Sequence, residues 1–130
     1  MTERSRPVEI IGVDTDTVEK DTTFPKAYAF YIQLSGKPDS VWERYLGQWK
    51  NALYQMKREI IVIDDKLRLV FEYGENLRNY VKYAKFLVKW VNERVEEHNR
   101  QLELKEKKAK AEQDTDQKKE EEIRRKLREL

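Results

Sequence analysis

The stretch EIIVIDDKLRLVFEY, residues 59–73, contains the pattern that decides the fold. Two runs rich in β-branched or alternating apolar residues flank the polar triplet Asp64-Asp65-Lys66. Two such runs around a short polar turn predict a β-hairpin. In the second run the apolar residues alternate, which places one set of side chains on a single face of the sheet. These side chains are Leu67, Leu69, Phe71 and Tyr73.

Upstream of the hairpin, residues 40–56 have helical spacing. Apolar residues recur there every three or four positions, as expected of a helix with one buried face. They are Trp42, Tyr45, Leu46, Trp49, Leu53 and Met56. Ser40 opens the segment and Glu43 follows three residues later, so the pattern predicts a capping box at the start of the helix.

Further upstream, residues 27–34 alternate between large apolar and smaller or polar side chains, which predicts a strand. Residues 8–13 form a short apolar stretch that is expected to be an edge strand or an arm. Between the two, residues 14–23 are rich in Asp and Thr. Their short side chains compete for backbone hydrogen bonds, so this run is expected to be a loop.

Downstream of the hairpin, Gly74 and Asn76 end the second strand and a long helix is expected to begin. Its predicted core face comprises Leu77, Val81, Ala84, Val88, Val91 and Val95. Beyond residue 102 charged residues dominate, and Asp114-Thr115-Asp116 interrupts them with poor helix formers. The sequence predicts a helix that weakens near residue 110, a break, and a short final helix. Disorder of this tail in the isolated protein is the alternative.

The predicted order is therefore strand, helix, strand, strand, long helix. This order describes an α+β fold with a small antiparallel-type sheet and two packed helices. It is most of a split βαβ arrangement without its last strand, for which residues 8–13 could substitute. The predicted organisation is an N-terminal arm (1–23), an α+β domain (24–102) and a charged helical or partly disordered tail (103–130).

Composition limits the classes of function. Charged residues make up 40% of the 130-residue chain, against a usual share of about a quarter. The net charge is only +2, so no overall field draws the chain to nucleic acid or to an anionic membrane. There is no cysteine, and no stretch has a signal-peptide or membrane-spanning pattern. We expect a cytoplasmic protein with no membrane partner.

The long helix has more apolar surface than a small sheet requires. Tyr83, Phe86 and Trp90 form a row about 100° or more away from its core face. Such a row is expected to be covered, either by the helix at 40–56 or the arm at 8–13, or by a protein partner or a second copy in a homodimer.

The C-terminal end of the tail carries a second candidate surface. Ile123, Leu127 and Leu130 follow i, i+4, i+7 spacing, which is the minimum pattern of a helix that docks in a groove. A frayed, solvated helix is the alternative reading of the same residues.

A basic row on the long helix indicates a different class of partner. The row comprises Arg78, Lys82, Lys85 and Lys89. Cations at successive helical turns match a line of phosphates, and Tyr31 on the sheet could stack on a base, so nucleic acid is the alternative partner. A solvated helix face explains the same lysines.

The sequence offers no catalytic constellation. His98, the single histidine, has no serine, cysteine or second histidine placed to work with it. The acidic clusters are explained by turns and caps, and the four glycines are scattered singly. We therefore expect no catalytic residue, no metal and no cofactor, and a non-enzymatic protein-protein interaction module.

Overall fold

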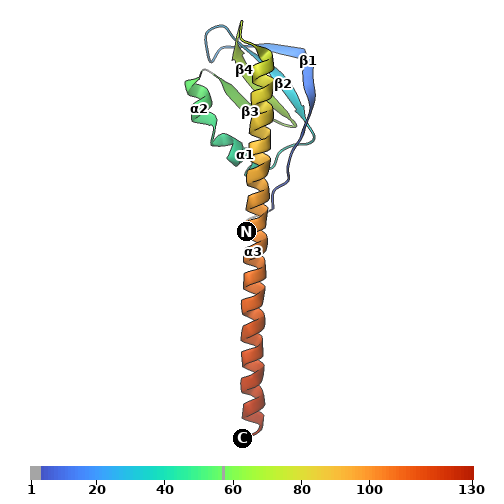
Figure 1. Ribbon diagram of the computed structural model, residues 1–130, viewed down its shortest axis with the longest axis vertical. Coiled ribbons are helices and arrows are strands. Elements are labelled where there is room, and N and C mark those ends of the chain that lie inside the picture. Colours follow the sequence, from blue (N-terminus) through green and yellow to red (C-terminus); the bar gives the residue numbers. More distant parts are fainter. Residues whose placement is uncertain (1–3, 57) are drawn as a thin grey trace. The chain divides into compact units, whose positions relative to one another are not determined.

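The computed structural model describes residues 4–56 and 58–130 (Figure 1). The elements follow the order β1 (Ile10–Asp21), β2 (Ala27–Leu34), α1 (Ser40–Gly47), α2 (Lys50–Gln55), β3 (Glu59–Ile63), β4 (Lys66–Glu72) and α3 (Leu77–Arg128). The described chain forms two compact units. One comprises residues 5–96, and the other comprises residue 4 with residues 97–130.

The four strands form one antiparallel sheet in the order β1-β2-β4-β3, so the predicted α+β fold is confirmed. The predicted hairpin is β3 and β4, with Ile61 opposite Arg68. Its turn is Asp64-Asp65, one residue shorter than the polar triplet suggests, because Lys66 already pairs with Ile63. Asp64 adopts a φ of 53°, a left-handed conformation that aspartate tolerates better than most residues.

The prediction of a loop at residues 14–23 is wrong for most of that segment, because β1 continues to Asp21 and pairs with β2 at Asp14 and again from Val18 to Asp21. The pairing register shifts between Asp14 and Val18. At the shift, the Asp14 carboxylate accepts the backbone N–H groups of Asp16 and Thr17, at 2.9 and 3.3 Å. The turn-forming tendency of aspartate therefore produces an irregularity within the strand.

The single helix predicted at 40–56 is two short helices, α1 and α2. The backbone N–H of Trp49 donates to the carbonyl of Leu46, an i to i−3 bond that tightens the chain at the junction. The predicted capping box at Ser40 is also wrong, because the cap lies one residue earlier. The Asp39 carboxylate accepts the N–H of Trp42 at 2.9 Å.

The predicted break at Asp114-Thr115-Asp116 does not occur, since α3 is continuous from Leu77 to Arg128. The Thr115 hydroxyl donates to the carbonyl of Ala111 at 2.9 Å, within the helix. Ion pairs one turn apart, each with the glutamate on the N-terminal side, favour the helical state. They are Glu103–Lys107, Glu120–Arg124 and Glu122–Lys126.

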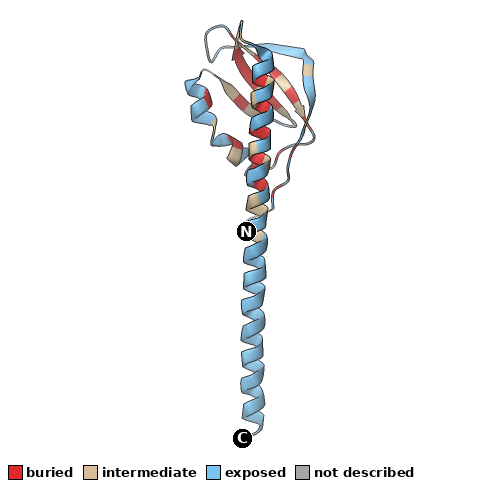
Figure 2. Cartoon of the chain, in the orientation of Figure 1, coloured by how far each residue is buried: buried red, intermediate tan, exposed pale blue. Residues whose placement is uncertain are grey.

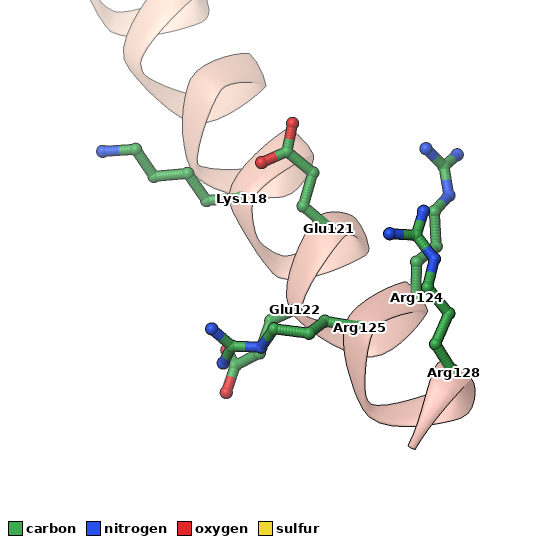
Figure 3. Close-up of a pocket in the computed structure, with 6 residues that line it drawn as sticks. All are labelled: Lys118, Glu121, Glu122, Arg124, Arg125 and Arg128. Carbon is green, nitrogen blue, oxygen red and sulfur yellow. The ribbon is translucent and has the colours of Figure 1, made fainter. Parts of the chain in front are cut away.

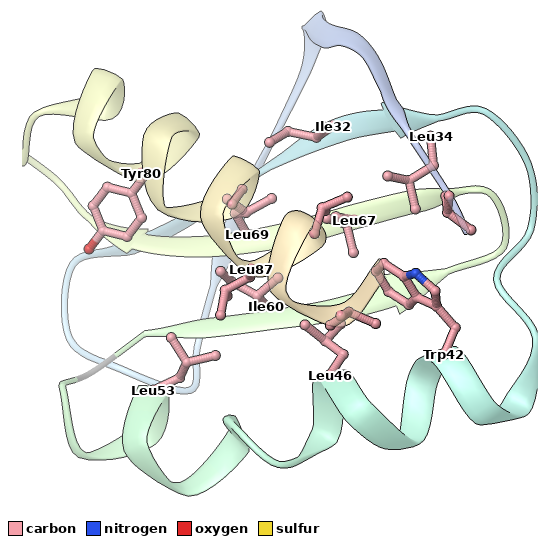
Figure 4. Packing of buried hydrophobic residues seen from close by; sticks show 14 of the residues in the cluster. Ile32, Leu34, Trp42, Leu46, Leu53, Ile60, Leu67, Leu69, Tyr80 and Leu87 are labelled. Atoms are coloured by element: carbon pink, nitrogen blue, oxygen red, sulfur yellow. The ribbon is translucent and has the colours of Figure 1, made fainter. Parts of the chain in front are cut away.

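The main core lies on one face of the sheet, against α1, α2 and the first part of α3 (Figure 4). Of the core face predicted for the long helix, Ala84, Val88, Val91 and Val95 are buried. Leu77 is 46% exposed, and Tyr80 and Leu87 are buried in addition. The buried face of α3 is therefore turned slightly toward the side of Tyr80 and Leu87.

The opposite face of the sheet has a smaller apolar cluster. Ala27, Ala29 and Val70 are buried there, and Phe24 packs against them from the loop before β2. Small side chains leave room for that ring, so part of this face is covered from within the chain.

Candidate interaction surfaces

The aromatic row of α3 is partly covered by a residue from the junction of α1 and α2. The Trp49 ring meets Trp90 edge-on at 5.5 Å between centroids and Phe86 at 6.1 Å. Tyr83 and Trp90 are half-buried against the main core, whereas Phe86 remains 50% exposed. Within the described chain, the expected cover by residues 40–56 thus exists for Trp90, and Phe86 is the member most available to a partner.

The three large apolar side chains near the C-terminal end of the tail are exposed to solvent. Every residue from Glu103 to Leu130 is exposed (Figure 2). Ile123 is 58% exposed, Leu127 61% and Leu130 100%. Ile123 and Leu127 are four residues apart and share one side of α3, and Leu130 follows two residues after the end of the helix, so the three form a short exposed apolar line.

Charged side chains occupy other sides of the same helix near its end. A hollow of about 560 Å³ is bounded by Lys118, Glu121, Glu122, Arg124, Arg125 and Arg128 (Figure 3). All six project from α3 alone, and each is exposed. The hollow is therefore the space between solvated side chains of one helix, with no enclosing wall that could hold a small ligand.

The basic row of α3 is exposed at Arg78, Lys82, Lys85 and Lys89. Lys85 and Lys89 border a groove of about 510 Å³ between the start of β1 and α3. Three carboxylates border the same groove, those of Glu9, Glu93 and Glu96. Acidic groups thus outnumber the lysines there, which weakens the attraction of this end of the row for phosphate.

Tyr31 is not brought together with the basic row. It alternates along β2 with Phe30 and Ile32, which point into the core beneath α3, so Tyr31 lies on the opposite face of the sheet. Its hydroxyl donates to a carboxylate oxygen of Glu19 at 2.9 Å. Burial and this bond raise the pKa of the Tyr31 hydroxyl above its ordinary value.

A charged network joins three strands on this opposite face. The Arg68 guanidinium on β4 donates to Asp21 at 2.9 Å and to Glu19 at 3.3 Å, both on β1. The Asp21 side chain is only 9% exposed. Hydrogen bonding from Thr23 and from Arg68 outweighs the effect of burial and holds the pKa of Asp21 below its ordinary value. The network fastens β1 across β2 to β4.

Replacing Arg68 with methionine should lower the free energy of unfolding by about 1–2 kcal/mol at neutral pH, because the buried Asp21 carboxylate loses a charged donor. The pKa of Asp21 is lower in the folded chain than its ordinary 3.8, so its contribution is complete above pH 3.8 and is lost as pH falls through the folded-state pKa. The difference between wild type and Arg68→Met should therefore narrow in that acidic range, as measured by urea unfolding at a series of pH values. Arg78→Met, at an exposed position, is the control and should change stability by less than about 0.5 kcal/mol.

A second polar network, which the sequence patterns did not indicate, fixes the N-terminal segment. The Asn92 side chain on α3 accepts the backbone N–H of Val8 at 3.0 Å and donates to the Val8 carbonyl at 2.8 Å. The same Asn92 oxygen accepts the indole N–H of Trp42 at 2.9 Å. The one sequence signal for this network was an asparagine directly beside the core face of α3, where a buried amide needs hydrogen-bond partners.

Asp39 holds the same segment from the other side. Its carboxylate accepts the Ser5 hydroxyl at 2.7 Å and the backbone N–H of Arg6 at 2.9 Å, in addition to capping α1. Burial opposes its ionisation, but hydrogen bonds from Trp42, Arg6 and Ser5 outweigh burial and hold the pKa of Asp39 below its ordinary value. Residues 5–8 are thus part of the compact unit.

His98 and the acidic residues were the other groups considered for catalysis or metal binding. His98 is half-buried on α3, and in the described part of the chain no three His, Cys, Asp or Glu side chains are grouped to hold a metal ion. Over the same residues, no helix combines the length and the apolar character that crossing a membrane requires.

Comparison with known proteins gives no further guide to function. No protein-family model matches the chain. No curated protein matches it. No solved structure matches it.

Proposed function

We propose that this protein is a non-enzymatic protein-protein interaction module that self-associates or docks through α3. The observation that carries the proposal is the exposed line formed by Ile123 and Leu127 on α3 and by Leu130 just after it, in a segment with no buried residue from Glu103 onward. A helix that is polar on nearly all sides is marginal by itself and gains most from an apolar contact. Burying this line against a partner would supply that contact.

The aromatic row supplies a second surface on the same helix. Phe86 is half exposed beside Tyr83, at 6.2 Å between ring centroids, so a partner could bury both rings. Trp90 is a weaker candidate, since it already packs against Trp49 and lies under the Arg94 guanidinium, 4.9 Å from its ring centre. Aromatic side chains are enriched where protein surfaces are buried by partners.

Replacing Ile123 and Leu127 together with aspartate should weaken self-association by roughly tenfold or more, because two central apolar anchors become charged. Light scattering and sedimentation of the full chain over a range of concentrations measure this change. Far-UV circular dichroism reports whether the helix itself persists.

Gln113→Asp with Gln117→Asp is the matched control for that pair. It introduces the same charge at the same four-residue spacing on exposed positions of the same helix. The control should associate like wild type. Equal weakening by both pairs would mean that charge, and not the apolar line, governs association, and an unchanged mass in the Ile123 and Leu127 variant would contradict self-association through the tail.

Nucleic-acid binding has less support. The cations of the basic row are exposed, but Tyr31 lies on the opposite face of the sheet and acidic residues border Lys85 and Lys89. It stays an alternative for the row alone, and retention on nucleic acid that falls as salt rises is its signature.

A further inference from the structure

Strand β3 has the composition of a central strand but lies at an edge of the sheet. Its sequence after Glu59 is Ile60-Ile61-Val62-Ile63, apolar on both faces. Runs of this kind are typical of strands that are covered on both faces of the sheet. In the described chain, however, β3 pairs only with β4, and Ile63 is 42% exposed.

Strand β1, at the other edge of the sheet, has features that protect it from pairing with another chain. Strand β1 has a register shift between Asp14 and Val18, and acidic or hydroxyl side chains occupy much of its length. Irregular pairing and charge are the usual means by which an edge strand avoids pairing with another chain. From Ile60 to Ile63, β3 has neither.

A groove of about 170 Å³ runs beside β3. Its walls are Ile60, Ile61 and Val62 on the strand and Glu43, Leu46, Gly47 and Lys50 on the helices. A Cβ placed on Gly47 would meet no atom within 4 Å, so the helical wall is open at its middle. The groove offers room for side chains of an added strand.

We propose that the occupant of this edge is β3 of a second copy, paired antiparallel about a two-fold axis at Ile61. Strand pairing of this kind would join the two sheets into one. In this register Ile61 faces itself across the axis, Ile60 faces Val62, and Ile63 faces Glu59.

The charges beside the strand agree with this symmetry. A two-fold interface must be self-complementary, so charges on opposite sides of its centre should have opposite sign. Arg58 precedes β3 and Asp64 follows it, each three residues from Ile61. The axis therefore places Arg58 of one copy opposite Asp64 of the other. The Arg58 side chain lies beside Glu75, at 3.9 Å, and over the Tyr80 ring, at 4.6 Å, and 32% of it remains exposed.

The charges on the helical wall of the groove also fit a two-fold axis. Glu43 and Lys50 lie on either side of the open position at Gly47, and both are exposed. The chain reverses after α2, where the N–H of Arg58 donates to the carbonyl of Leu53, so the helices and β3 run in opposite directions along the groove (Figure 4). The same axis thus brings Glu43 of one copy toward Lys50 of the other.

The test uses the full chain carrying Ile123→Asp and Leu127→Asp, so that association through the tail is removed. In this background Ile61→Lys alone and Ile61→Glu alone should each weaken self-association by roughly tenfold or more, because like charges meet at the axis. Mixing the two variants should restore a dimer, since lysine then faces glutamate. Sedimentation gives the mass, and ion-exchange separation of differently charged chains identifies the mixed dimer.

Ile63→Lys in the same background is the matched control. It places the same side chain on the same face of β3, but opposite Glu59 of the second copy, so dimerisation should persist. Recovery of the dimer on mixing also demonstrates that the Ile61 variants are folded.

Three results would overturn the proposal. They are a monomeric background protein, equal loss of association in Ile61→Lys and Ile63→Lys, or no recovery on mixing. If the background protein is monomeric, an extended segment of a different protein would be the remaining candidate to pair with the free edge of β3. The proposal uses no residue of the α3 surfaces, so its failure and that of the proposed function give separate results.

Discussion

Replacing Trp42 with alanine should lower the free energy of unfolding by about 3–5 kcal/mol, the usual cost of removing a large buried aromatic side chain. Trp42 is fully buried in the main core between α1 and the sheet. Alanine would leave a cavity and would also remove the indole N–H that donates to Asn92. Urea unfolding followed by far-UV circular dichroism measures the loss.

Trp42→Phe separates these two contributions. Phenylalanine retains most of the apolar volume but lacks the indole donor, so its cost should be clearly smaller than that of alanine. If the two variants were equally stable, the cavity would not dominate and the proposed role of Trp42 in the core would be wrong.

Replacing Asn92 with leucine should lower the free energy of unfolding by about 2–4 kcal/mol, although leucine is similar in size and more apolar. The substitution leaves the Trp42 indole N–H and both backbone groups of Val8 without their partner on α3. A polar group left unpaired in a buried position costs more than a hydrogen bond contributes. The same urea titration measures the effect.

Two further variants test whether the loss of stability is specific to the hydrogen bonds of Asn92. Asn92→Asp keeps an oxygen for Trp42 and for the Val8 N–H but loses the donor to the Val8 carbonyl, so its cost should be intermediate. Asn79→Leu, at an exposed position of the same helix, should change stability by less than about 0.5 kcal/mol. A leucine variant at position 92 as stable as wild type would mean that the N-terminal segment is not fixed by α3.

The parts of the fold that were predicted correctly depend on local patterns. The alternation in residues 27–34 and 67–73 specifies strands because only one register buries the large side chains. The helical spacing after Asn76 likewise specifies α3. These signals are contained within a few neighbouring residues and need no knowledge of the rest of the chain.

The errors occur where contacts distant in sequence overrule local tendency. Residues 14–21 have the composition of a loop, yet Asp14 and residues 18–21 pair with β2, and Asp21 is fixed by Arg68 on β4. Asp114-Thr115-Asp116 has low helix propensity, but propensity is a weak guide when the helix continues on both sides.

The candidate surfaces show the same division. The spacing of Tyr83, Phe86 and Trp90 correctly indicated a shared side of the helix, but only the structure brings Trp49 against it. No periodicity could relate Val8 to Asn92, since the bond joins residues 84 positions apart. The edge position of β3 was likewise hidden, because its composition is that of an interior strand.

The hydrogen bonds between Asn92 and Val8 also affect the order in which segments of the chain can fold during synthesis. Residues 5–8 leave the ribosome before the rest of their compact unit, and their partner on α3 is made more than 80 residues later. At a translation rate of about 5–20 residues per second, the segment waits several seconds before it can be fixed. Residues 5–8 are therefore among the last parts of their compact unit to reach their final place.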